Sequence, residues 1–375
     1  GITTTGSTVI TGLDTAPPGI LLWRALLQWL GGIGIIVMAI SILPLLQVGG
    51  MQLFRMESSD SSDKAFPRVA QISAATAIIY TILTLVCAVA MWGAGMTPFE
   101  AAAHSMTTIA TGGFSTSDAS IGHFDSALMD WIVIVFMILG SLPFVLYFAM
   151  IRGNPRALVR DTQVQWFLIT VAVSILLVAF WLVSKNDIEL LRAIRLSSFN
   201  VVSIITGTGY ASADYNAWGL LPVTAFFFFM FVGGCAGSTS CGIKIFRYQI
   251  LFANTRVQFR RMWQPNVVYS PRYNHKPIPE SVTDAVMSFF FMFALIFGVL
   301  ALALSLIGLD FVTAVSGAAT AIANVGPALG PTIGPSGTFA PLPDAAKWVL
   351  SIGMLLGRLE LFTVLVLFSP AFWRA

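Results

Sequence analysis

Four short glycine turns constrain this chain more than any other feature. Each joins a glycine to small, hydroxyl or amide residues, and each stands beside segments rich in apolar residues. The turns recur at intervals of about one hundred residues, which is the mark of a repeated structural unit. Their glycines are Gly6, Gly112, Gly207 and Gly326. We therefore expect four repeats, in residues 1–66, 67–160, 161–276 and 277–375.

The composition indicates the solvent of these repeats. Hydrophobic residues make up 57% of the chain and charged residues only 10%, which is typical of an all-α polytopic membrane protein in a lipid bilayer. About 20 apolar residues suffice to cross the hydrocarbon core. Uncharged runs that meet this length occupy residues 25–54, 69–99, 131–151, 162–184, 215–243 and 285–309. A last apolar run, residues 345–369, contains Arg358 and Glu360.

A helix-start signature before the second turn predicts a re-entrant segment. Thr97 is a candidate N-cap, Pro98 takes the first helical position and Glu100 follows three residues after the cap. Only about a dozen residues separate Pro98 from the turn, so a helix here reaches about halfway through the membrane. Similar short helices are predicted to start at Asn186 and Asp310. Non-helical backbone at that depth is tolerated only around water or ions.

The chemistry of the turns favours a pore for an alkali cation. Glycine lets successive carbonyl oxygens point at one axis, where they can replace the water around an ion. A transition-metal site would need His, Cys or carboxylate ligands, and the turns contain none. His104, in the short helix before the second turn, is expected to be packed or hydrogen-bonded rather than an ion ligand. Cys87, Cys235 and Cys241 lack CxxC spacing and are expected to be packing residues.

Charge placement predicts the orientation of the chain. Basic residues gather in connections on one side of the predicted membrane, which the positive-inside rule makes cytoplasmic. They are Arg55, Lys64, Arg68, Arg152, Arg156, Arg160, Lys244, Arg247, Arg256, Arg260, Arg261, Arg272, Lys276 and Arg374. The opposite side carries Asp14, Asp118, Asp125, Asp187, Asp214 and Asp344. These acids form either a cation-attracting vestibule or ordinary solvated loops.

A glycine-rich segment and a single arginine are the candidate gate. The segment interrupts the run at residues 215–243 and has too many glycines and hydroxyl residues for a stable helix. Its candidate residues are Gly233, Gly234, Gly237, Ser238, Thr239, Ser240 and Gly242. Arg358, predicted near mid-helix, is unfavourable in the membrane by a few kcal/mol. Either it pairs with Glu360 or a carbonyl in the bundle, or it faces the pore below the turns and holds the glycine-rich loop; we favour the second.

Two rival interpretations are weak. Residues 237–244 superficially resemble a phosphate-binding loop, but the lysine is displaced by one position and a membrane span precedes it. An enzyme would need paired titratable groups in the membrane, and Arg358 and Glu360, two apart on a helix, do not face each other. The serious alternative is a symporter, whose midplane site would use discontinuous helices.

At these motifs the chain resembles a known family, the bacterial Trk potassium uptake proteins of the TrkH/TrkG type, within the Trk/Ktr/HKT superfamily. The resemblance covers nearly the whole chain. The motifs that carry it are TTTGSTVITGLD at residues 3–14, WLGGIGI at 29–35, ATGGFST at 110–116, ITGTGY at 205–210 and NVGPALG at 324–330.

The resemblance implies a K+-translocating subunit in the bacterial inner membrane, with four potassium-channel-like helix, pore-helix, helix repeats around a central pore. It implies a homodimer with a cytosolic nucleotide-binding, TrkA-like subunit, and no enzyme activity, cofactor or nucleic-acid partner. The implied filter residues are Thr4, Thr5, Gly6, Ala110, Thr111, Gly112, Ile205, Thr206, Gly207, Asn324, Val325 and Gly326. The implied gate is the loop at 233–242 with Arg358.

The chain is expected to be N-terminally incomplete, because the outer helix and pore helix of repeat one are missing. The alternative function is a K+ symporter coupled to H+ or Na+.

Overall fold

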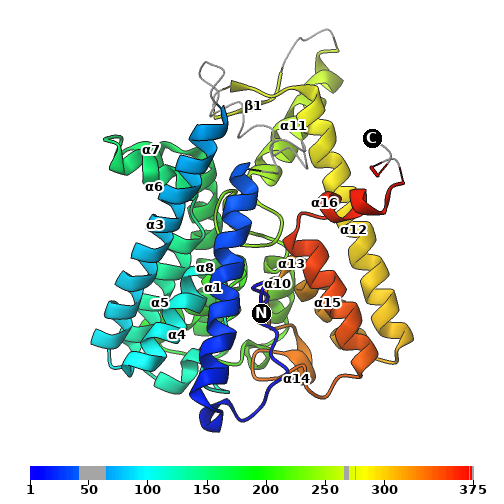
Figure 1. The fold of residues 1–375 in the computed structure, drawn as a ribbon. Coiled ribbons are helices and arrows are strands. Elements are labelled where there is room, and N and C mark those ends of the chain that lie inside the picture. The colour runs from blue at the N-terminus through cyan, green and yellow to red at the C-terminus, as the bar shows by residue number, and fades with distance from the viewer. Residues whose placement is uncertain (42–64, 266–269, 275, 371, 374–375) are drawn as a thin grey trace.

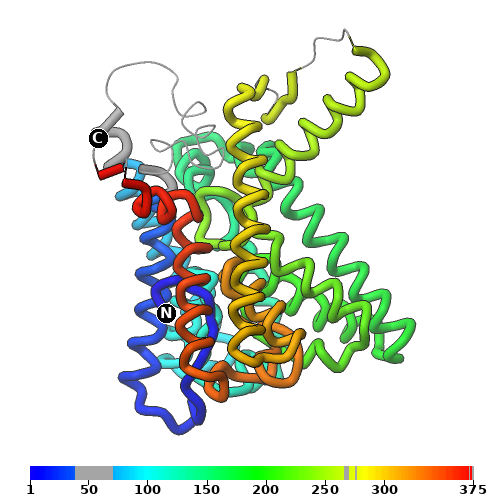
Figure 2. The backbone as a smooth tube through the Cα atoms, turned by 90° about the vertical axis from the view of Figure 1, so that its right-hand side faces the viewer, coloured from blue at the N-terminus to red at the C-terminus, as the bar shows by residue number. Residues whose placement is uncertain are grey.

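The computed structural model describes residues 1–41, 65–265, 270–274, 276–370 and 372–373, which are mostly helical. Long helices run along the molecule, and shorter helices and loops lie between them (Figures 1 and 2). The long helices are α1 (Pro18–Ser41), α3 (Ala65–Gly93), α8 (Thr162–Lys185) and α12 (Glu280–Leu306). Within the described residues, 4 helices are long and apolar enough to cross a membrane, or up to 6 if each of two bent pairs counts as one span. The predicted all-α membrane fold is confirmed.

A short helix packs against the long helix that precedes it at three places in the chain. The pairs are α4 (Pro98–Ile109) on α3, α9 (Leu190–Ile205) on α8, and α13 (Phe311–Ala323) on α12. Each short helix ends just before one of the glycine turns, so the chain reverses inside the bundle. The same order of elements therefore recurs along the chain, as a repeated unit requires.

Two of the three predicted starts of short helices are confirmed. Thr97 and Glu100 form the full capping box at α4, and the Asp310 carboxylate accepts a hydrogen bond from the Thr313 N–H at 3.1 Å to cap α13. The predicted start at Asn186 is wrong. The Asn186 N–H donates to Leu182 O and closes α8, so that α9 begins only at Leu190.

The first predicted span also starts at the wrong residue. The uncharged run begins at residue 25, but α1 begins at Pro18 and so includes Arg24. The buried Arg24 guanidinium donates to Thr8 Oγ1 at 3.0 Å and Ser115 O at 3.4 Å, and it lies 4.2 Å from the centre of the Phe114 ring. These partners compensate the buried charge of Arg24. A span defined as an uncharged run stops at this residue, although the helix does not. The predicted end of this span, at residue 54, lies outside the described residues.

The run at 131–151, predicted as one span, is broken. It contains most of α5 (Ala127–Gly140) and all of α6 (Phe144–Ile151), which meet at 89°. Pro143 lies at the break, and proline has no N–H to continue a helix.

The last apolar run is bent too, and this corrects the position of Arg358. Helix α15 (Asp344–Arg358) meets the segment that begins with α16 (Phe362–Leu365) at 106°. Between them Glu360 has φ 62° and Leu361 φ 39°, outside the right-handed helical region. Arg358 is therefore the last residue of its helix and not a mid-helix residue, so its side chain and neighbouring carbonyls can meet groups beyond the helix.

The third repeat is discontinuous as well. Within the described residues of the predicted span at 215–243, α10 (Leu220–Phe229) is the only α-helix, and a 3-10 turn at Tyr215–Trp218 precedes it. The glycine-rich segment follows, and then α11 (Ile245–Trp263) projects beyond the bundle (Figure 2). Arg247, Arg256, Arg260 and Arg261, predicted to lie in a connection, therefore belong to this helix, and Lys244 is its N-cap.

The smaller elements connect these helices. They are α7 (Ala157–Arg160), α14 (Gly330–Ile333), the 3-10 turns Leu13–Thr15, Ser120–Phe124, Tyr215–Trp218 and Val366–Phe368, and the antiparallel strands β1 (Arg272–Tyr273) and β2 (Lys276–Pro277). Helices α7 and α11 and strand β1 lie at one end of the molecule, whereas α14 lies at the other (Figure 1).

Of the predicted basic residues, Arg55, Lys64 and Arg374 and the side chains of Arg68 and Lys276 lie outside the described residues.

Candidate functional site

The four glycine turns share one backbone pattern. In each turn, two residues with positive φ are separated by a single residue. The pairs, with their φ values, are Thr4 and Gly6 (53° and 82°), Thr111 and Gly113 (49° and 76°), Gly207 and Gly209 (73° and 81°), and Asn324 and Gly326 (53° and 111°). The pattern defines which positions of the four turns are equivalent.

The second residue of each pair is a glycine for a second reason, which is contact with the next turn. A Cβ placed on any of them would meet the carbonyl oxygen of the middle residue of another turn. Gly6 faces Gly112 O, Gly113 faces Thr208 O, Gly209 faces Val325 O and Gly326 faces Thr5 O. The order runs from the first turn to the second, third and fourth, and then back to the first. The four turns therefore form a closed ring.

This ring shifts the register of the predicted filter residues. Thr4, Thr5 and Gly6 are equivalent to Asn324, Val325 and Gly326, as the sequence suggests. In the second turn the equivalent residues are Thr111, Gly112 and Gly113, and in the third they are Gly207, Thr208 and Gly209. Ala110 is the C-cap of α4, and Ile205 and Thr206 are the last residue and C-cap of α9. The prediction aligns the first glycine of each motif, which is off by one residue in the second turn and by two in the third. The equivalent glycines are identified only by what their Cβ positions would meet in the neighbouring turn.

Side chains behind the ring hold the turns in place. The Asn324 amide donates to Thr5 Oγ1 at 2.9 Å and to Met354 O at 2.7 Å. The Ser203 hydroxyl donates to Tyr210 O at 2.6 Å, just after the third turn. These bonds tie the turns to the short helices and to α15, and they limit how far each turn can move.

Gln28 is a further residue of the site, which the sequence analysis did not single out. Its side chain is buried and comes from α1. Its Nε2 donates to Gly112 O at 2.6 Å, and its Oε1 accepts from the Phe114 N–H at 3.0 Å. The available signal was a polar residue inside an uncharged run, which by itself is too common to indicate a role.

His104 supports the second turn from behind, in accord with the prediction that it is packed and hydrogen-bonded. Its ring nitrogens lie 2.9 Å from Glu100 O and 3.0 Å from Ser115 Oγ. Its backbone carbonyl accepts from the Tyr210 hydroxyl at 3.2 Å. The imidazole thus supports the second turn region, and the backbone carbonyl of the same residue links it to Tyr210 after the third turn.

The glycine-rich loop, residues 233–242, lies directly against the ends of two short helices. The Thr239 hydroxyl is 2.9 Å from both Ile109 O and Gly140 O. The Ser240 hydroxyl donates to Thr206 O at 2.6 Å. Ile109 and Thr206 immediately precede the second and third turns, so the loop occupies the space next to the ring.

The same loop fits into the break between α5 and α6. The Phe144 N–H donates to Gly237 O at 3.0 Å, and the Cys235 N–H donates to Ser141 O at 3.0 Å. Gln163 of α8 accepts from the Ala236 N–H at 2.6 Å. The bend in the second repeat therefore provides backbone groups that an unbroken helix would have used internally.

Arg358 holds the other side of the loop. One guanidinium nitrogen donates to Thr239 O at 3.0 Å and also contacts Cys241 Sγ, and the other donates to Gly31 O at 2.9 Å. The side chain is buried. Cys241, expected to be only a packing residue, therefore contacts the arginine as well. The arginine and the predicted loop are brought together, as expected from the second of the two hypotheses for Arg358.

The first hypothesis has two parts, a pair with Glu360 or with a carbonyl in the bundle. The carbonyl is found, because Gly31 O of α1 accepts from Arg358, but the pair with Glu360 is wrong. Glu360 Oε2 instead accepts from Arg247 at 2.6 Å, and the Arg247 guanidinium carbon lies 3.7 Å from the centre of the Phe289 ring. Lys244 donates to Ser240 O within the loop. Three buried basic side chains thus surround the loop and the bend after α15.

Glycines of the packing segments are explained by close approach. A Cβ on Gly31 would meet Ile2 O, one on Gly32 would lie 2.6 Å from the Tyr80 hydroxyl, and one on Gly357 would meet Ile322 O. Gly31 and Gly32 therefore let neighbouring segments approach α1 closely, and Gly357 brings α15 against the end of α13.

Comparison with known proteins identifies the family. The model of the family TrkH, described as a cation transport protein, matches residues 1–375. The chain is 53% identical over 374 residues to the Trk system potassium uptake protein TrkI of Halomonas elongata, covering 100% of this chain and 76% of the relative. It is 42% identical over 381 residues to the Trk system potassium uptake protein TrkH of Vibrio parahaemolyticus, covering 100% and 78%. The crystal structure of the potassium transporter TrkH from Vibrio parahaemolyticus matches with a TM-score of 0.90 and 39% identity, covering 99% of this chain and 77% of that one. The chain belongs to the TrkH family of cation transport proteins.

Proposed function

We propose that this chain is the K+-translocating subunit of a Trk potassium uptake system, with its four glycine turns as the selectivity filter. The observation that carries the proposal is the closed ring, in which each turn contacts the next at a glycine. A ring of backbone around one axis supplies neutral oxygens on all sides of a dehydrated cation. Such oxygens suit an alkali ion.

The short helices favour a cation at the same place. Helices α4, α9 and α13 all end at turns of the ring. The C-terminal end of a helix carries the negative pole of its dipole. Three such poles near the ring lower the electrostatic energy of a cation there.

In the proposed gate, the loop at 233–242 obstructs the path beside the filter and Arg358 keeps it there. The hydroxyls of Thr239 and Ser240 hold the loop against Ile109 O and Thr206 O, and Arg358 holds it through Thr239 O. The arginine charge also repels cations below the filter. Conduction then requires these contacts to be released.

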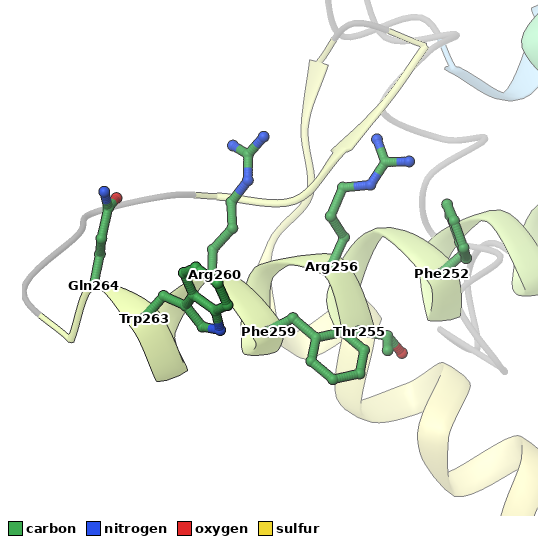
Figure 3. Close-up of a pocket in the computed structure, with 7 residues that line it drawn as sticks. All are labelled: Phe252, Thr255, Arg256, Phe259, Arg260, Trp263 and Gln264. Carbon is green, nitrogen blue, oxygen red and sulfur yellow. The ribbon is translucent and has the colours of Figure 1, made fainter.

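The proposed setting is the inner membrane of a bacterium, as a homodimer with a cytosolic nucleotide-binding subunit. The repeats at 1–66, 67–160, 161–276 and 277–375 each contribute one turn to the filter. Helix α11 is the proposed docking element for the cytosolic subunit. Phe252, Thr255, Arg256, Phe259, Arg260, Trp263 and Gln264 line a shallow pocket along it (Figure 3). An exposed surface of arginine and aromatic residues is typical of protein interfaces.

Ion flux into vesicles that contain the purified protein tests the function. We expect uptake of K+ and Rb+ well above that of Na+ and Li+, because the filter is built for a large alkali ion. A current that reverses at the K+ equilibrium potential, whatever the H+ and Na+ gradients, excludes coupled symport. Equal uptake of all four ions would contradict the proposed filter.

A further inference from the structure

Gln28 makes a two-point contact with the second filter turn. The side chain is fully buried, and both ends of its carboxamide are used. Nε2 donates to Gly112 O at 2.6 Å, and Oε1 accepts from the Phe114 N–H at 3.0 Å. One planar group therefore ties together two backbone groups on either side of Gly113, in the way that a neighbouring strand would.

The amide of Gln28 explains why residue 112 is a glycine. A Cβ at this position would lie 2.5 Å from Gln28 Oε1 and 2.9 Å from Nε2. Gly113, in contrast, has φ 76° and faces Thr208 O. The two adjacent residues are thus glycines for different reasons: a side chain at Gly113 would block the contact with Thr208 O in the ring, and one at Gly112 would overlap the Gln28 amide.

The first and third turns show what Gln28 replaces. The positions equivalent to Gly112 are Thr5, Thr208 and Val325, all of which carry side chains. Thr5 Oγ1 accepts from the Asn324 amide at 2.9 Å, and Thr208 Oγ1 lies 2.7 Å from Thr206 Oγ1. The first and third turns therefore have a polar group of their own at this position. In the second turn, the polar group comes from α1.

We propose that Gln28 is a positioning residue for ion selection, which holds the second filter turn at the distance from the axis that suits K+. The inference rests on the proposed function of the turns as the filter. Na+ is smaller than K+, so a turn that is free to shift towards the axis can coordinate Na+ as well. Without the Gln28 amide, both Gly112 O and the Phe114 N–H lose their partner, and the second turn loses its restraint.

The first test is Gln28→Leu, which removes both hydrogen bonds and keeps the side chain large. In vesicles with equal amounts of folded protein, we expect the K+/Na+ uptake ratio to fall about fivefold, the factor given by the net free energy of one hydrogen bond. The matched control is Gln163→Leu. Gln163 is also buried, but it accepts from Ala236 N–H in the gate loop, so its loss is expected to change the total flux and leave the ratio at the parent value.

A double variant separates positioning from general packing. Gly112→Thr alone is expected to lower the ratio, because its Cβ overlaps the Gln28 amide. Combined with Gln28→Ala, the same threonine has room and reproduces the side chain found at Thr5 and Thr208. We expect the double variant to have a higher K+/Na+ ratio than either Gly112→Thr or Gln28→Ala, which a merely additive loss of packing cannot give.

The outcomes are distinguishable. A parent protein that does not prefer K+ to Na+ overturns the proposed function itself. If the parent prefers K+ and folded Gln28→Leu keeps the parent ratio, the inference about Gln28 is overturned. An equal loss of ratio in Gln163→Leu also overturns it. If Gln28→Leu does not fold, Gln28→Glu is used instead: it keeps an acceptor for Phe114 N–H and places a carboxylate oxygen against Gly112 O, and an unchanged ratio in it is equally decisive.

Discussion

The ring of glycine turns and the loop at 233–242, which are the proposed filter and the proposed gate, lie next to each other and are held in different ways. The ring consists of four equivalent turns. In each, the backbone of a glycine lies against a carbonyl oxygen of another turn, and these glycines are Gly6, Gly113, Gly209 and Gly326. The loop occurs once. Backbone hydrogen bonds anchor it in the break between α5 and α6, but its bonds towards the ring come from side chains: the hydroxyls of Thr239 and Ser240 and the charge of Arg358. Backbone contacts in a closed ring cannot be released one at a time, whereas side-chain hydrogen bonds can.

If the ring is the filter and the loop is the gate, as proposed, this difference would let the flux change while the selectivity stays constant. Residue 244 directly precedes α11, so the loop continues into the helix that projects from the bundle. The ion pair between Arg247 of α11 and Glu360 connects this helix to the bend just after Arg358. A displacement of α11 is therefore expected to act on the loop and on its arginine together, and to leave the ring in place.

The largest effect is expected from Gly209→Ala, which breaks the ring. An L-residue in the left-handed region costs about 1–2 kcal/mol, and the new Cβ would also overlap Val325 O. We expect the K+/Na+ uptake ratio to fall by roughly a hundredfold, since about 1.4 kcal/mol corresponds to tenfold. Gly207→Ala is the matched control: φ is 73° there against 81° at Gly209, but its Cβ would lie 3.4 Å from the nearest atom, Asn324 O. An equal loss in both variants would contradict the register of the ring.

Arg358→Ala is expected to have the next largest effect, on flux and not on selectivity. It removes the hydrogen bonds to Thr239 O and Gly31 O, and bonds made by a charged group are worth about 1.5–3 kcal/mol each. We expect K+ uptake without the cytosolic subunit to rise about tenfold or more at an unchanged K+/Na+ ratio. Arg358→Lys keeps the charge but not the planar fork, so it should fall between parent and alanine. Basal uptake no higher than that of the parent would place the gate elsewhere.

Ser240→Ala should have a smaller effect of the same kind. Its hydroxyl donates to Thr206 O at 2.6 Å and accepts from the Gly234 N–H at 2.8 Å. The loss of about one net hydrogen bond predicts a rise in basal uptake of about fivefold. Ser238→Ala is the comparison, because the Ser238 hydroxyl bonds only Cys235 O within the loop itself in the described structure. The same rise in both variants would show that loop stiffness, and not contact with the filter region, controls the flux.

The smallest effect is expected from charge reversal on α11, in the variant that carries both Arg260→Glu and Arg261→Glu. Both side chains are exposed, and exposed ion pairs contribute at most about 1 kcal/mol each. We expect the amount of cytosolic subunit that co-purifies to fall a few-fold, and the fall to be larger at low salt. Without the cytosolic subunit, the variant is expected to take up K+ at the parent rate. Undiminished co-purification at low salt would argue against docking at this helix.

Sequence alone determined the solvent, the repeats and most helix positions. An uncharged run of sufficient length predicts a span because burying charge in lipid is costly, and α8 and α12 agree closely with their runs. Capping chemistry located α4 and α13, since Thr97 and Asp310 act on N–H groups only three residues away. Local interactions of this kind are visible in a short window of sequence.

Only the tertiary structure decided the register of the four glycine turns, the bends and the partners of the buried charges. Gly113, and not Gly112, is the residue equivalent to Gly6, because Thr208 O from the next repeat occupies its Cβ position. Glu360 pairs with Arg247, 113 residues away, and not with Arg358 two residues before it. Gln28 contacts the second turn only because the fold brings α1 beside it. These features depend on which atoms of distant segments compete for the same space, and no local pattern in the chain contains that information.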